Sequence, residues 1–149
     1  QRRAAAAPKP AMRTTVRLAL SMLLHEPRLA QEVENPRELE GLQLPGIPLL
    51  IRLLEVLKEQ PHIGTAAVLE RWRDSDEGRH LSRLLQIDPP AGTQADIEQE
   101  FRDTLQHLLE RRRRQRAEYL EEKLRRKEPL NQEEKTEWQQ MIMQRPGTG

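Results

Sequence analysis

The chain has 149 residues, a length that fits one domain or a domain with an appendage. Only 36% of the residues are hydrophobic, but Leu, Ile, Val and Phe together still exceed the share of about 20% below which chains tend to be disordered. The absence of cysteine excludes disulfides and thiolate metal sites, and the net charge is only +1. No apolar run reaches the 18 residues typical of a membrane-spanning helix.

The chain begins with QRRAAAAPKP rather than with Met. This stretch has no apolar core of the kind that a signal peptide needs, so residues 1–11 are interpreted as an interdomain linker in a piece of a longer protein. Apolar residues then recur at helical spacing from Met12 to Leu23, and this first helix should end just before Pro27.

The next segments predict short helices separated by proline and glycine. A turn at Leu44-Pro45-Gly46 precedes a helix that starts at Pro48, closes at Pro61 and is apolar nearly all round, as in a central bundle helix. Strand-forming residues are scarce, which favours an all-α fold. The other predicted helical segments before residue 90 are Pro27 to Val33, Asn35 to Leu39, Thr65 to Arg73 and Asp74 to Gln86.

The longest predicted element runs without interruption from Thr93 to Lys127. Thr93 is a suitable N-cap, and Pro129 stops the helix. At 1.5 Å per residue the helix is roughly 50 Å long, whereas a compact globule of this chain length is only about 35–40 Å across. The helix should therefore leave the first core and carry a second element outward.

The composition of this helix changes along its length. Its first third carries a core-facing stripe, its middle (Glu110 to Arg116) has nothing apolar and is interpreted as a solvated strut, and its last third should belong to a second unit. Asn131 and Glu134 form a capping-box pattern for a last helix that ends near Met143. The stripe consists of Ile97, Phe101, Leu105, Leu108 and Leu109.

The predicted fold is therefore all-α: a helical bundle followed by a long connecting helix and a C-terminal helical hairpin. We expect the bundle to cover residues 12–109 and the long-helix extension with the hairpin to cover residues 110–145. Residues 146–149 should form a frayed tail.

No pattern of catalytic or metal-binding residues is present. The four histidines lack the spacing of metal ligands, and the acidic run from Asp74 to Glu77 is explained by a helix start. Phosphate-binding glycine loops, a nucleophile in a recognisable context and a convincing carboxylate pair are all missing. We expect a non-catalytic chain without metal or cofactor.

The basic run from Arg111 to Lys127 holds nine Lys or Arg against three Glu, a net charge of +6. This density would attract phosphates and supports an alternative function as a basic helical nucleic-acid-binding module. Its single aromatic residue, Tyr119, does not supply the stacking platform typical of single-strand binders. A solvated strut explains the same residues without any ligand.

The hairpin is too small to be stable alone, yet it is rich in apolar residues. Some of these residues must close the hairpin on itself, and any that stay exposed would form a patch for a partner. Both outcomes stay open, as does a dimer formed by exchange of the hairpin between chains. The apolar residues are Tyr119, Leu120, Leu124, Leu130, Trp138, Met141 and Ile142.

Four segments, in this order and spacing, resemble the C-terminal helicase-binding domain of bacterial DNA primase (DnaG): MRTTVRLALSMLLHEP, LPGIPLLIRLLEVL, IEQEFRDTLQHLLE and LNQEEKTEWQQMI. The resemblance covers about Met12 to Ile142. It implies a cytoplasmic domain that docks on the hexameric, DnaB-type replicative helicase, recruits primase to the replication fork within the primosome and modulates unwinding. The zinc and magnesium of the full-length family, an RNA-polymerising transferase, are implied to belong to upstream modules.

The resemblance also implies two sets of site residues. The docking surface for the helicase is assigned to Tyr119, Leu120, Leu124, Leu130, Trp138, Met141, Ile142 and Arg145. The sequence departs from the family pattern from Arg145 to Gly149. A second site, for the acidic C-terminal tail of single-stranded DNA-binding protein, is assigned to Met12, Arg13, Val16 and Arg83. Direct binding of nucleic acid is expected to be weak or absent, and no membrane is expected as a partner. The chain is expected to be a monomer or a hairpin-exchanged dimer.

Overall fold

The computed structural model describes the backbone of residues 10–144 and the side chains of residues 15–144. Within this range every regular element is helical, which confirms the predicted all-α class. The chain forms two compact units, unit 1 from Gln1 to Leu109 and unit 2 from Glu110 to Gly149. The predicted frayed tail and residues 1–9 of the predicted linker lie outside the described residues.

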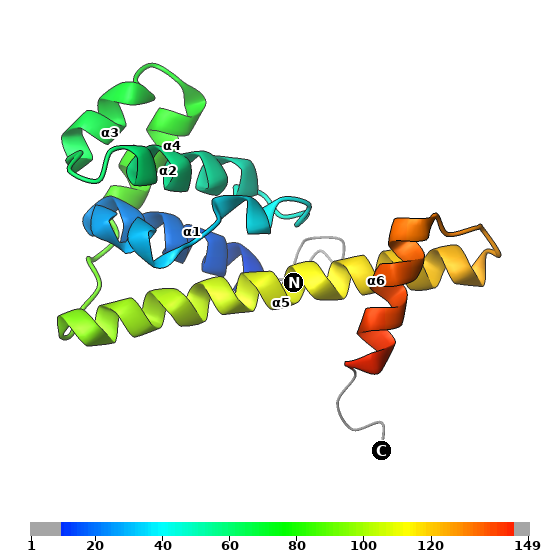
Figure 1. The fold of residues 1–149 in the computed structure, drawn as a ribbon. Coiled ribbons are helices and arrows are strands. Elements are labelled where there is room, and N and C mark those ends of the chain that lie inside the picture. The colour runs from blue at the N-terminus through cyan, green and yellow to red at the C-terminus, as the bar shows by residue number, and fades with distance from the viewer. Residues whose placement is uncertain (1–9, 145–149) are drawn as a thin grey trace, which may run out of the picture. The chain divides into compact units, whose positions relative to one another are not determined.

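Unit 1 contains most of the helices (Figure 1). α1 already includes Pro10 and Ala11, which were predicted to belong to the linker. Proline is favoured at the first position of a helix, so Pro10 starts α1 rather than preceding it. The elements are α1 (Pro10–His25), the 3-10 helices η1 (Pro27–Glu32) and η2 (Pro36–Leu39), α2 (Ile47–Glu59), α3 (Thr65–Arg71), α4 (Asp76–Leu85) and the first half of α5 (Gln94–Arg125).

The core of unit 1 is centred on α2, as its apolar sequence predicts. Leu50, Leu53 and Leu54 are completely buried, and α2 contacts α1, η1 and η2. Gly46 precedes this helix at φ 91°, a left-handed conformation that glycine adopts without steric cost. The side chains of Ile97, Phe101 and Leu108 add the buried stripe of α5 to the same core.

Helix α5 begins where the sequence predicts but ends earlier. Thr93 Oγ1 accepts from the backbone N–H of Asp96, and the Asp96 carboxylate accepts from the N–H of Thr93, both at 3.1 Å. At the other end, the N–H groups of Lys127 and Glu128 bond to the carbonyls of Leu124 and Lys123. This closing turn requires Lys127 at φ 62°. The helix therefore ends at Arg125 rather than at Lys127.

The start of α4 gives a stability prediction. Ser75 Oγ accepts from the N–H of Gly78 at 3.0 Å, and a Cβ added at Gly78 would lie 2.0 Å from the backbone oxygen of Trp72. Because backbone must move to relieve this overlap, we expect Gly78→Ala to lower the free energy of unfolding by about 1–3 kcal/mol in thermal or urea unfolding.

Gly64→Ala is the matched control. A Cβ at Gly64, which precedes α3, meets no atom within 4 Å, so its cost should be limited to the N-cap preference, below about 1 kcal/mol. Equal unfolding curves for the two variants would contradict the described packing of α4.

Candidate functional site

Unit 2 has a very small interior. Among its described residues, 110–144, Leu120 and Glu134 alone are buried. Leu120 lies on the second half of α5, and Glu134 lies in the first turn of α6 (Gln132–Met143). Such a small buried area contributes little hydrophobic stabilisation, so the two helices need additional interactions to stay together.

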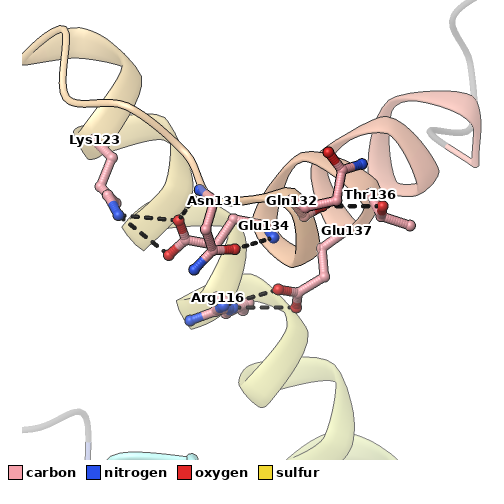
Figure 2. Close-up of polar contacts among 7 residues, drawn as sticks. All are labelled: Arg116, Lys123, Asn131, Gln132, Glu134, Thr136 and Glu137. Carbon is pink, nitrogen blue, oxygen red and sulfur yellow. Dashed lines mark hydrogen bonds and ion pairs between the residues drawn. The ribbon is translucent and has the colours of Figure 1, made fainter.

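Glu134 supplies one of these interactions (Figure 2). Its carboxylate accepts from the backbone N–H of Asn131 at 2.9 Å, while Asn131 Oδ1 accepts from the N–H of Glu134 at 2.8 Å. This reciprocal cap confirms the capping box predicted for the last helix. The same carboxylate pairs with Lys123 Nζ of α5 at 3.0 and 3.2 Å. One buried carboxylate thus starts α6 and ties it to α5.

Arg116 makes a second bridge between the two helices. Its Nε and Nη2 donate to the two carboxylate oxygens of Glu137 at 3.1 and 2.8 Å, a bidentate arrangement visible in Figure 2. These hydrogen bonds, followed by the negative charges of Glu137 and Glu134, raise the pKa of Arg116. The predicted solvated strut is therefore wrong at Arg116, which is half-buried and belongs to the hairpin.

The basic run as a whole is partly neutralised. Besides Arg116 and Lys123, both Arg125 and Arg126 form ion pairs with Glu122 of the same helix. Arg113 and Arg114 are exposed. The pairs with Glu122 are already included in the net charge of +6, but Glu137 and Glu134 lie outside the run and offset the charges of Arg116 and Lys123.

Several apolar side chains of unit 2 stay on the surface. The exposed fractions are 48% for Tyr119, 41% for Leu124, 49% for Ile142 and 84% for Met143. Leu130, Trp138 and Met141 are half-buried. Six of the residues assigned to the helicase-docking surface therefore keep accessible area, which is what a contact surface requires.

The structure changes the predicted helicase-docking surface at two residues, and a third residue lies outside the described part of the chain. Leu120 is completely buried, so it supports the hairpin from inside and does not form part of an exposed surface. Met143, the neighbour of Ile142 at the end of α6, is also exposed and was missed, because no local sequence signal distinguishes it from a buried apolar residue. Arg145 lies outside the described residues.

The second set of site residues is only partly brought together. The side chains of Met12 and Arg13 are outside the described residues, Val16 is buried at 1% exposure, and Arg83 of α4 is exposed. Val16 is thus a core residue. Arg17 of α1 is exposed, and His80 of α4 is half-buried. Burial, followed by the charges of Arg83 and Arg17, lowers the pKa of His80, and the helices that carry these residues, α1 and α4, pack against each other.

Other kinds of site are not supported in the described part of the chain. Residues 10–144 include no group of three or more His, Asp or Glu that could hold a metal ion. None of the helices in this range combines the length and the apolar character that crossing a membrane requires.

A helical bundle followed by a hairpin that is closed by charged side chains and exposes apolar ones has the organisation of a helical protein-interaction module. The family model described as "DNA primase DnaG DnaB-binding" matches residues 16–141. The chain belongs to this family, the DnaB-binding domain of bacterial DNA primases, which confirms the resemblance seen in the sequence.

Individual relatives agree with this assignment. The chain is 35% identical over 103 residues to the DNA primase of Pasteurella multocida and 32% identical over 98 residues to that of Escherichia coli K12. These matches cover 69% and 66% of the chain but only 18% and 17% of the relatives' own length. The crystal structure of the DnaG primase C-terminal domain from Vibrio cholerae matches with a TM-score of 0.73 and 32% identity, covering 87% of this chain and 93% of that one.

The contacts of Glu134 with Asn131 and Lys123 predict that the packing of α6 on α5 weakens at acidic pH. Hydrogen bonding by the Asn131 N–H, followed by Lys123, lowers the pKa of Glu134 below its usual value of 4.5. Its stabilising effect is therefore present above about pH 4.5 and is lost as the pH falls through the lower folded-state pKa. We expect amide exchange in α6 to become faster as the pH falls through this folded-state pKa. Glu134→Gln keeps the helix cap but removes the charge, so the exchange rate should depend less on pH in this variant.

Glu133→Gln is the control, because Glu133 is the exposed neighbour of Glu134. It should leave the acid-induced change in amide exchange unaltered. An identical pH profile for Glu134→Gln and the unmodified chain would contradict the role of this carboxylate.

Proposed function

We propose that this chain docks on the replicative helicase, a DnaB-type hexamer, and thereby recruits a primase to the replication fork and modulates unwinding. Membership of the DnaB-binding family supports the choice of partner. In this proposal the chain itself is non-catalytic and cytoplasmic, and primer synthesis with its zinc and magnesium belongs to other parts of a longer protein. Its relatives are several times longer than the matched region, which is consistent with that division.

The exposed apolar side chains of unit 2 carry the assignment of the docking surface. Ile142 and Met143 lie side by side in sequence at the end of α6, at 49% and 84% exposure. Fully burying a large apolar side chain contributes about 1.5–3 kcal/mol relative to leaving it exposed. Covering this surface with a partner would therefore recover a stabilisation that the hairpin cannot obtain by itself.

We expect Ile142→Asp to lower the affinity for the N-terminal region of the helicase by at least about tenfold, because it places a charge in an apolar contact. Titration calorimetry measures the affinity, and circular dichroism checks that the helix content is unchanged.

Gln140→Asp is the matched control. Gln140 is exposed on the same helix, and two residues of rotation, about 200°, point it away from Ile142. If Ile142→Asp keeps its helix content and binds the helicase region with unchanged affinity, the assignment of the docking surface is wrong.

We also propose that the electropositive region around Arg17, His80 and Arg83 binds the acidic C-terminal tail of single-stranded DNA-binding protein. Arg17 and Arg83 are both exposed, and their charges act together on the half-buried His80. A carboxylate-rich peptide could form charge-assisted hydrogen bonds with these two guanidinium groups. Val16 contributes to this site only through the packing of α1, and Arg13 stays a prediction of the resemblance.

For this second site we expect Arg17→Glu combined with Arg83→Glu to weaken binding of an acidic peptide with a hydrophobic C-terminal residue by about tenfold or more. The loss should shrink as salt screens the charges. Fluorescence anisotropy of a labelled peptide measures it, with Arg71→Glu on the exposed side of α3 as a control of equal charge change per site. Equal peptide affinities for the variant and the control would refute the site.

A further inference from the structure

We propose that Arg116 and Lys123 are positioning residues that hold the ring of Tyr119 in place as an anchor for the partner of unit 2. The inference rests on the proposed docking of the hairpin on the helicase and goes further by stating how one anchor is presented. Tyr119 is the one tyrosine of the chain and is 48% exposed.

The spacing along α5 places both cations next to the ring. Arg116 precedes Tyr119 by three residues and Lys123 follows it by four, and residues at these separations are neighbours on a helix surface. The guanidinium carbon of Arg116 lies over the ring at 5.1 Å from its centroid, and Lys123 Nζ lies over it at 5.6 Å. Both distances fall within the range of about 6 Å in which a cation is attracted to an aromatic face.

The two cations are themselves held by the other helix. Glu137 binds Arg116 through two hydrogen bonds, and Glu134 binds Lys123 with both carboxylate oxygens (Figure 2). Glu134 cannot move freely, because it also caps α6 through Asn131. The position of the Tyr119 ring is therefore linked to the closure of α6 on α5.

This arrangement suits a ring that is to be covered by another protein. An exposed aromatic ring that is already fixed loses less rotational freedom on binding than a mobile one. The Tyr119 hydroxyl has no hydrogen-bond partner within the described part of the chain, so it is available to an acceptor or donor on the partner. Each cation should accordingly change the affinity through Tyr119 by about two- to fivefold.

Selective isotope labelling of tyrosine tests the proposal in the free protein, since every ring signal then reports on Tyr119. We expect Arg116→Gln and Glu137→Gln each to shift the ring resonances and increase ring mobility, although Glu137 does not touch the ring. Lys123→Gln should do the same, and Lys123→Arg should restore the original signals because it keeps a cation. Arg113→Gln, which removes an exposed charge from the same helix, is the control.

The affinity for the helicase N-terminal region provides the second measurement. Arg116→Gln should weaken it two- to fivefold more in the unmodified chain than in a Tyr119→Leu background, because the part of the loss that acts through the ring is absent there. Unchanged ring signals, or an equal loss of affinity in both backgrounds, would overturn the inference. If Ile142→Asp weakens docking and Arg116→Gln does not, the positioning role of Arg116 is wrong but the docking surface stands. If neither variant weakens docking, the proposed docking surface is wrong as well.

Discussion

The small interior of unit 2 is the constraint on which its other properties depend. With only Leu120 and Glu134 buried among residues 110–144, apolar burial cannot hold α6 against α5, and charged side chains take over that task. Exposed ion pairs contribute little to stability, but these pairs are bidentate or combined with a helix cap. The same shortage of interior volume leaves Ile142 and Met143 on the surface. The ion pairs that close the hairpin and the exposed apolar side chains therefore both follow from the small interior of unit 2.

Unit 1, in contrast, is held together by a buried apolar core. Helices α1 and α2, together with the stripe of α5, form a continuous apolar core around residues such as Leu50 and Phe101. Ion pairs such as Arg102 with Glu32 lie at the surface and are not needed to complete that core. In the proposed function, unit 1 is a stable body that carries Arg17 and Arg83 on α1 and α4, and unit 2 is the contact element whose stability increases when it binds its partner.

Local sequence signals predicted the elements well, because caps and helix stops act over a few residues. Thr93 with Asp96 and Asn131 with Glu134 are found as expected. The end of α5 was missed because the left-handed conformation of Lys127 is unusual for a residue other than glycine. The pairing of Arg116 with Glu137 was also missed. It joins residues 21 positions apart and depends on how two weakly amphipathic helices meet, which no local pattern specifies. For the same reason the burial of Leu120 and the exposure of Met143 could not be distinguished in advance.

Hydrogen–deuterium exchange of the chain with and without the helicase N-terminal region tests the central claim most directly. A hairpin that is closed by a few charged contacts and covered by its partner should show its largest gain in protection in α6 and in the second half of α5. Protection confined to unit 1, with exchange in residues 119–143 unchanged, would contradict the claim that the hairpin is the contact element.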